Sequence, residues 1–193
     1  MRIVVTIKQV PFVDQLKFDH ATRCLVREGV ESEINPFDKR ALTQAVTLKR
    51  QLGAEVVVIT MGPPHAKDAL VEALAMGADR AVHLLGRGFA GADTLATARA
   101  LALACRKIGF DLILAGRYAT DAETAQVPPM LAELLDLPQL TAVTALQLSP
   151  DQKSVVARRE LDEFVERPIR SFCCASPFRD IRRRKTAPHV PAV

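Results

Sequence analysis

The chain has 193 residues, of which 49% are hydrophobic and 25% charged, which fits one globular α/β domain with at most an appendage. Disorder, collagen and coiled coil are disfavoured as descriptions of the whole chain. The net charge of +4 is unevenly spread, because residues 1–150 hold 16 Lys and Arg against 16 Asp and Glu, whereas residues 151–193 hold 10 against 6. A neutral body with a basic end is not the pattern of a nucleic-acid reader.

The first residues and the cysteines limit the cellular setting. The apolar run between Arg2 and Lys8 is too short for a signal peptide or a membrane span, so we expect neither. None of the cysteines has the C-x-x-C spacing of a metal pair. They are Cys24, Cys105, Cys173 and Cys174. We expect reduced thiols, buried as small hydrophobes, in a cytoplasmic protein without a metal site.

Short β-branched runs alternate with longer stretches of helical period, which is typical of parallel strands joined by crossover helices. The first run lacks apolar–polar alternation and is therefore expected to be buried on both faces. In chain order, the predicted elements are a strand at 3–7, a weak strand at 24–26, a helix at 36–52, a strand at 55–60, a helix at 66–76, a strand at 81–85, a helix at 94–108, a strand at 111–116, a helix through 130–135, and antiparallel strands at 141–148 and 154–159.

Residues typical of helix ends support this order. Pro36 suits a first helical turn, Gly53 and Gly77 are typical terminators, and Asp93 is a candidate N-cap. Together the elements predict an α/β fold. It is a Rossmann-like, doubly wound, mostly parallel sheet of about five strands, followed by a C-terminal antiparallel β extension.

The loops after the predicted strands are the candidate site, because ligands bind beyond the carboxyl ends of parallel strands. Of the loops at 8–11, 61–64 and 116–127, the last supplies Asp121 and Thr124 just before a helix. Backbone N–H groups and the threonine hydroxyl there would hold a phosphate at the positive end of the helix dipole. From the residues alone, capping of the helix by Asp121 and Thr124 is the simpler interpretation.

Catalytic patterns are few. The sequence has no P-loop, no H-E-x-x-H and no G-x-S-x-G motif, and we expect no classical G-x-G-x-x-G site, so dinucleotide, P-loop, zincin and hydrolase functions have no anchor. The histidines are expected to be structural or solvated. They are His20, His65, His83 and His189. The residues alone therefore predict a nucleotide-binding domain without a nucleophile or another catalytic side chain.

Seven stretches, in order over residues 1 to about 160, are similar to one protein family. They are 7–11, 26–30, 34–39, 61–64, 73–79, 89–97 and 119–127. The chain resembles the β subunits of electron transfer flavoproteins, within them the subgroup that includes nitrogen-fixation-associated and flavin-bifurcating members. Because the seven matching stretches are spread in order over the chain, a chance similarity is implausible.

The resemblance implies a Rossmann-like domain of the adenine nucleotide alpha hydrolase kind, paired with a flavin-carrying α subunit. It implies binding of FAD or AMP and electron transfer between dehydrogenases and ferredoxin-linked or quinone-linked partners, with no nucleic acid and no membrane span. By the same matching, the cofactor-binding residues are expected to be Thr6, Asn35, Phe37, Asp38, Met61, Gly116, Arg117, Tyr118, Ala119, Asp121, Thr124, Ala125, Gln126 and Val127.

The loop at 121–127 bears on the choice between FAD and AMP. Its letters D-A-E-T-A-Q-V are closer to the family's FAD-binding version, D-G-D-T-A-Q-V, than to its AMP version. Three departures are Tyr118, where the family usually has Gln, and Ala122 and Pro128, where it usually has Gly. Ala122 requires a position without a positive φ, and Pro128 removes one N–H donor from the helix start. Both cofactors stay open, with FAD favoured.

The resemblance fails from near residue 162. The family's C-terminal arm, which crosses to the α subunit and docks dehydrogenases, is expected to be absent from this sequence. We therefore divide the chain into a nucleotide-binding domain at 1–160 and a divergent, basic C-terminal segment at 161–193, whose charge run at 182–185 is expected to be a solvated tail.

Two other classes of function are considered. A stand-alone ATP- or AMP-binding protein of the same fold would need a glycine-rich pyrophosphate loop after the first strand, which residues 8–11 do not provide. A non-catalytic, β-like scaffold subunit would pair with an α subunit without docking dehydrogenases.

Overall fold

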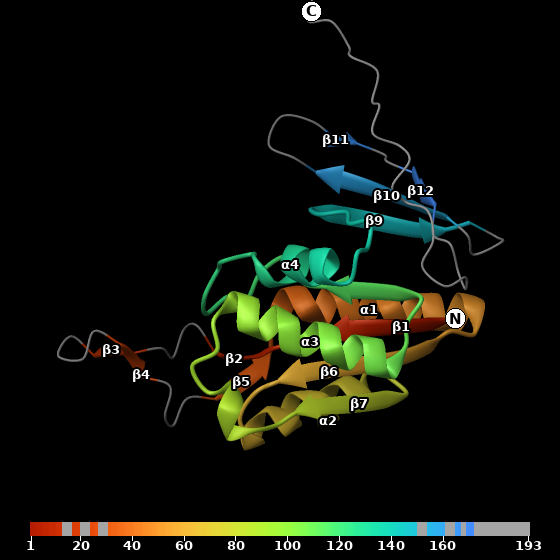
Figure 1. Ribbon diagram of the computed structural model, residues 1–193. Helices are drawn as coiled ribbons and strands as arrows, with labels where there is room; N and C mark the ends of the chain where they lie inside the picture. The colour runs from red at the N-terminus through yellow and green to blue at the C-terminus, as the bar shows by residue number, and fades with distance from the viewer. Residues whose placement is uncertain are drawn as a thin grey trace, which may run out of the picture.

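The computed structural model describes residues 1–12, 17–19, 24–26, 31–149, 154–160, 165–166 and 169–171. A parallel sheet lies at its centre (Figure 1). Its four strands are β1 (Arg2–Thr6), β6 (Glu55–Met61), β7 (Arg80–Leu84) and β8 (Leu112–Ala115), in the spatial order β7-β6-β1-β8. Within the described residues the parallel sheet thus has four strands, where the sequence predicted about five.

The sheet changes its direction of growth at β1. Along the chain, β6 and β7 are added on one side of β1, whereas β8 pairs with its other side, up to Thr6 opposite Ala115. Such a switch point opens a crevice beyond the carboxyl ends of the two strands, because the connections that follow them leave in opposite directions. The fold therefore places a crevice beyond Thr6 and Ala115, where sheets of this kind bind their ligands.

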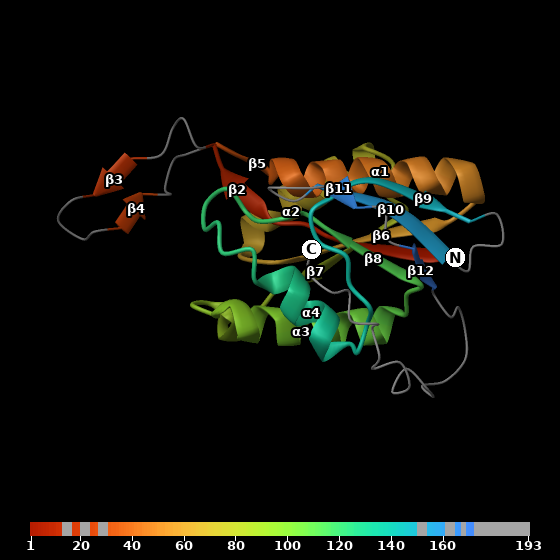
Figure 2. The same cartoon turned by 90° about the horizontal axis from the view of Figure 1, so that it is seen from above.

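Helices cover both faces of the sheet, as the view from above shows (Figure 2). They are α1 (Pro36–Leu52), α2 (Lys67–Ala75), α3 (Thr94–Ile108) and α4 (Val127–Leu134). Successive side chains of a strand point to opposite faces, so Ile3 and Val5 pack with α1 and α2, whereas Val4 packs with α3 and α4. The predicted doubly wound α/β fold is confirmed.

The helices begin and end where the sequence predicted. Pro36 occupies the first position of α1, and Gly53 follows its end in the left-handed conformation with a φ of 67°. The Asp93 carboxylate accepts a 2.7 Å hydrogen bond from the Ala96 N–H and caps α3. A short 3₁₀ turn, η2 (Pro64–Ala66), precedes α2, because proline suits a first helical turn.

Short antiparallel pairs lie between β1 and α1. β2 (Gln9–Pro11) pairs with β5 (Ser32–Ile34). β3 (Lys17–Asp19) pairs with β4 (Cys24–Val26), at the weak strand expected from the sequence. These pairs lead the chain away from the sheet after β1 and return it to the start of α1 (Figure 1).

The C-terminal extension is antiparallel, as predicted. Its strands are β9 (Val143–Leu148), β10 (Ser154–Glu160), β11 (Val165–Glu166) and β12 (Ile169–Ser171), and the other three pair with β10. Leu146 and Leu148 pack against the core on the α1 side of the parallel sheet. The extension continues past residue 160, and the rest of 161–193 lies outside the described residues. The division there, the missing arm and the solvated tail stay predictions.

Cys105 is the one cysteine whose side chain the described residues include. It is buried in α3 as a free thiol, and burial raises its pKa to about 11. This is the expected small buried hydrophobe. In the described part of the chain, no helix is both long enough and apolar enough to cross a membrane.

Candidate functional site

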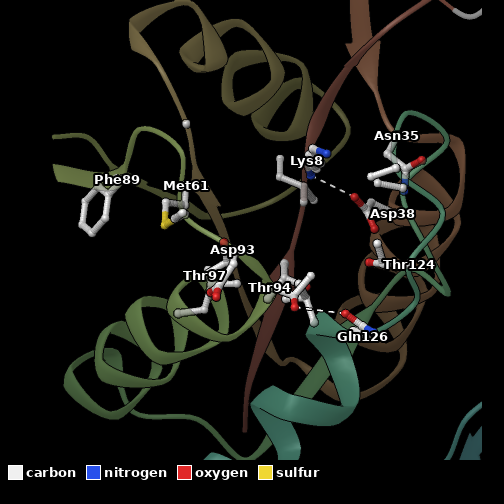
Figure 3. Close-up of a pocket in the computed structure, with 18 of the residues that line it drawn as sticks. Lys8, Asn35, Asp38, Met61, Phe89, Asp93, Thr94, Thr97, Thr124 and Gln126 are labelled. Carbon is white, nitrogen blue, oxygen red and sulfur yellow. Dashed lines mark hydrogen bonds between the residues drawn. The ribbon is translucent and has the colours of Figure 1, made fainter. Parts of the chain in front are cut away.

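A cavity of about 980 Å³ lies at the switch point (Figure 3). Each parallel strand brings a residue to its wall at or just after its carboxyl end: Thr6 from β1, Met61 from β6, Leu85 after β7 and Ala115 from β8. This volume is at the upper end of the roughly 300–1,000 Å³ that small-molecule sites occupy. The strand ends therefore enclose room for a large ligand.

Most of the residues expected to bind a cofactor line this cavity. They are Thr6, Asn35, Asp38, Met61, Gly116, Tyr118, Ala119, Thr124, Ala125, Gln126 and Val127. The other three, Phe37, Arg117 and Asp121, do not line it. A place on the wall does not by itself assign a role, so binding by these residues stays a prediction.

Asn35 joins the start of α1 to the loop after β8. The residue is fully buried. Its Nδ2 donates a 2.8 Å hydrogen bond to the Tyr118 carbonyl, and its Oδ1 accepts one of 3.2 Å from the Thr120 N–H. Both polar atoms of the side-chain amide are therefore hydrogen-bonded to the loop backbone, and the buried side chain holds that loop against the start of α1.

Asp38 forms a second link, between the ends of two strands. Its Oδ2 accepts a 2.8 Å bond from the Lys8 N–H after β1 (Figure 3), and its Oδ1 accepts a 3.0 Å bond from the Gly116 N–H after β8. Burial raises the pKa of the Asp38 carboxyl to about 7, although hydrogen bonds from Lys8, Asn35 and Gly116 act in the opposite direction. The carboxyl sits where β1 and β8 separate.

Gly116 is required by this close approach. A Cβ at this position would lie 2.8 Å from the Asp38 backbone nitrogen and 2.9 Å from the Phe37 carbonyl carbon, and closer still to the Asp38 carboxylate. No side chain fits there. Phe37 packs its ring 4.3 Å from the ring of Tyr118, measured between centroids, so Phe37 supports a residue of the wall from behind.

Asp121 pairs with the cation that follows β1. Its carboxylate oxygens lie 2.6 and 2.8 Å from the Lys8 ammonium, and its side chain is only 3% exposed. The N-cap position of α4 is Gln126, and no side chain caps that helix. The interpretation that Asp121 and Thr124 only cap α4 is therefore wrong.

The first turns of α3 and α4 meet at the cavity. The Thr94 hydroxyl donates a 3.0 Å bond to the Gln126 side-chain oxygen and joins the two helix starts (Figure 3). Asp93 already places a carboxylate at the start of α3, whereas α4 has no side-chain cap. Pro128 and Pro129 have no N–H, and the Met130 N–H bonds the Gln126 carbonyl. Val127 is therefore the one residue among the first three of α4 with an N–H that could face an anion.

The backbone of the loop between β8 and α4 accommodates Ala122 and Pro128, which depart from the family pattern. The positive φ values fall on Glu123 and Ala125, both 53°, and not on Ala122. The condition set for Ala122 by the sequence is therefore met. Pro128 lies in the first turn of α4, where its missing N–H breaks no hydrogen bond of the helix.

The sequence interpretation missed the loop after β7 as part of the site. Residues 85–94 line the cavity apart from Gly88 and carry a short 3₁₀ turn, η3 (Arg87–Phe89). The expectation of no G-x-G-x-x-G site was wrong about the spacing, because Gly86, Gly88 and Gly91 have it, after a strand and before a helix. Gly91 has a φ of 74°, and a Cβ there would meet nothing within 4 Å. Its backbone conformation, and not crowding, favours glycine.

The side chains at the wall suit binding more than bond-making. Lys8 and Arg87 are its cations, and Asp38 and Asp93 its carboxylates. Among the described residues, no group of three or more His, Cys, Asp and Glu side chains could hold a metal. His65 and His83 do not line the cavity, and the His83 Nε2 lies 3.1 Å from the carbonyl of Gly62. His20 and His189 lie outside the described residues.

Residues 22–168 match the family model of the electron transfer flavoprotein domain. The chain belongs to this family. It is 53% identical over 151 residues to the "Electron transfer flavoprotein subunit beta" of Clostridium acetobutylicum, covering 78% of this chain and 58% of that protein. It is 50% identical over 151 residues to "Protein FixA" of Azorhizobium caulinodans, covering 76% of this chain and 54% of that protein.

A third relative of this electron transfer flavoprotein chain carries a different name. It is the "Caffeyl-CoA reductase-Etf complex subunit CarD" of Acetobacterium woodii, 43% identical over 187 residues, with 94% of this chain and 71% of that protein covered. The chain thus spans between 54% and 71% of the length of these three relatives. A universal stress protein solved with cAMP is similar at 16% identity and a TM-score of 0.40, covering 75% of this chain and 97% of that one.

Proposed function

We propose that this chain is the β subunit of a heterodimeric electron transfer flavoprotein and binds FAD in the cavity at the switch point. With an α subunit it would carry electrons between a dehydrogenase and a ferredoxin-linked or quinone-linked partner. The observation that carries the proposal is the match to the family over residues 22–168 together with the cavity, most of whose lining residues lie in that range. The cysteine pattern and the composition favour a cytoplasmic location.

The cavity fits an adenine nucleotide at one end. The start of α4 has no side-chain cap, and Thr124 and Gln126 lie beside it on the wall (Figure 3). The Val127 N–H at this helix start, with the Thr124 hydroxyl and the Gln126 amide nearby, would suit phosphate oxygens. We assign the phosphates to this end and the adenosine part to the wall formed by Thr6 and Met61.

The size of the cavity favours FAD over AMP. Phe89 lies on the opposite side of the cavity from Thr124 (Figure 3), and it lines the cavity together with Leu85 and Met61. AMP would fill only the phosphate and adenosine end. The apolar wall beyond it suits a planar ring system. The flavin supplies the redox chemistry when bound, whereas the residues of this chain bind it, orient it and exclude water.

The test is the flavin content of the chain produced together with its α subunit. An absorbance spectrum and release of nucleotides on denaturation would give the flavin and AMP per heterodimer. Two flavins per pair are expected, one of them in this chain. One flavin with one AMP would assign AMP to the cavity, and one flavin without AMP would contradict nucleotide binding. ATP turnover by the isolated chain would favour the stand-alone alternative.

Two substitutions test the phosphate end. Thr124→Ala and Gln126→Ala are each expected to weaken nucleotide retention about tenfold, because each removes one hydrogen bond to a charged group. Thr47→Ala is a matched control, since Thr47 is exposed on α1 and its hydroxyl bonds only the Thr43 carbonyl of its own helix. Retention that is unchanged in both variants would move the phosphate site elsewhere.

A further inference from the structure

Three connections hold the start of the β8–α4 loop at the switch point. Asn35 binds the backbone of Tyr118 and Thr120, and Lys8 pairs with Asp121. The third connection is Asp38, which joins the end of β1 directly to the end of β8. The loop that these contacts fix carries Thr124 and Gln126 on the cavity wall.

Asp38 is engaged in a way that leaves it little capacity for a ligand. One carboxylate oxygen accepts the Lys8 N–H and the other accepts the Gly116 N–H, and the residue is only 7% exposed. A carboxylate would also repel a phosphate in this poorly solvated position. The family match implies that Asp38 binds the cofactor directly. Its environment is explained better by a structural role, in which Asp38 holds the backbone around the cavity.

We propose that Asp38 is a positioning residue, whose ionised carboxylate links the Lys8 and Gly116 amides and so sets the distance between the end of β1 and the phosphate-binding loop. The inference rests on the proposed nucleotide site. It assigns the carboxylate to the chain's own backbone and not to the ligand.

The ionised form is the one that the geometry needs. Both oxygens face N–H donors, so a proton on either oxygen places an O–H against an N–H and removes one bond. The charge of Lys8, after β1, favours the ionised carboxylate. Other charged residues near Asp38 in the chain or through these contacts are Asp121 and Arg117 in the β8–α4 loop, and Lys39 and Arg40 on α1. Lys8 is paired with Asp121, Lys39 with Glu72, and Arg40 lies over the Phe37 ring.

The first test replaces Asp38 by asparagine and measures FAD binding to the full chain from pH 5.5 to 8.5. FAD is the probe because the phosphate monoester of AMP titrates near pH 6. In the wild-type protein we expect affinity to rise with pH through about 7, where the pKa of Asp38 lies. Asp38→Asn keeps the shape but turns an acceptor into a donor, so its affinity is expected to be about tenfold lower at pH 8 and flat across this range.

The second test moves the loop without changing a polar group. Gly116→Ala places a methyl group against Asp38 and Phe37, and the same loss of FAD affinity is expected. A matched control is Asp79→Asn. The Asp79 carboxylate also accepts a strand N–H, that of Val56 at 2.9 Å, but at the opposite end of the sheet. This control is expected to leave FAD affinity unchanged.

Amide hydrogen exchange in the ligand-free protein gives a readout that does not depend on binding. Peptides spanning residues 116–127 are expected to exchange faster in Asp38→Asn than in wild type, and unchanged in Asp79→Asn. Wild-type protein that binds no FAD would contradict the proposed function and leave the exchange result to decide the inference. Wild-type protein that binds FAD, with equal affinity and pH profile in Asp38→Asn, would overturn the inference alone. Affinity that rises as the pH falls would overturn it too, since repulsion of the ligand would then dominate.

Discussion

A buried carboxyl with a raised pKa makes the stability of this protein depend on pH. The pKa of Asp38 is about 7 in the folded chain and about 3.9 in an unfolded one. Between these values the folded state binds more protons than the unfolded state. The stabilising contribution of this group is therefore fully present below about pH 4 and is lost as the pH rises through 7.

The corresponding prediction compares wild type with Asp38→Asn in urea unfolding at pH 5, 6, 7 and 8. The free energy of unfolding of wild type, minus that of the variant, is expected to fall as the pH rises from 5 to 7, by at most about 1.4 kcal/mol per pH unit. It is expected to level off above 7. Parallel curves would show that Asp38 titrates near its ordinary pKa. The ionised form that the loop needs is thus the form that the fold disfavours.

At the scale of elements, the two helices that start at the cavity differ in what occupies their first turns. The Asp93 carboxylate satisfies an N–H of α3. In α4, Pro128 and Pro129 take the place of residues whose N–H groups would need a cap, and Gln126 makes no side-chain cap. The first helix start is thus stabilised by a cap and the second by its prolines.

Removal of the α3 cap tests this division. Asp93→Ala is expected to lower the free energy of unfolding by about 1 kcal/mol, because the Ala96 N–H loses its partner. Asp68→Ala is the control, since Asp68 is an exposed carboxylate in the first turn of α2 and caps nothing. Equal losses in the two variants, measured by urea unfolding, would show a dipole effect and not a cap.

The sequence predicted the elements well because their signals are local. Buried β-branched runs, Pro36 at a helix start and Gly53 after a helix end each depend on neighbouring residues. The supporting roles of Asn35 and Asp38 are not local, since their loop partners lie about 80 residues further on. A family motif can mark such residues as part of a site, but only the folded chain shows that they hold a loop. The loop after β7 was missed although its glycine spacing was visible.

At the scale of the molecule, the two ends of the parallel sheet are built differently. At the end where the strands start, carboxylates accept strand amides, as Asp111 does from the Arg2 N–H at 2.7 Å and Asp79 does from Val56. At the other end, Asp38 makes one such link, between the Lys8 and Gly116 amides, and the loops after all four strands surround the cavity. The first end is closed by short contacts, whereas the second holds the cavity.

Hydrogen exchange with and without FAD would map this asymmetry. Protection is expected in peptides that cover 61–64, 85–93 and 116–127, because bound ligand orders the loops of the cavity. No change is expected in peptides that cover 53–56 and 109–112. Protection of both sets of peptides would indicate a general stabilisation of the fold. Protection only of the peptides at 53–56 and 109–112 would place the ligand away from the cavity.

The contact between Gly116 and the first turn of α1 makes two distant positions interdependent. A side chain at position 116 would meet the backbone of Phe37 and Asp38 as well as the Asp38 carboxylate, so a smaller residue at position 38 would not by itself make room for it. Substitutions at the two sites are nevertheless in contact and are not expected to add in their effects. A relative is therefore expected to keep glycine at position 116 whatever residue it carries at position 38. The constraint acts in one direction, from the backbone of α1 onto the loop after β8.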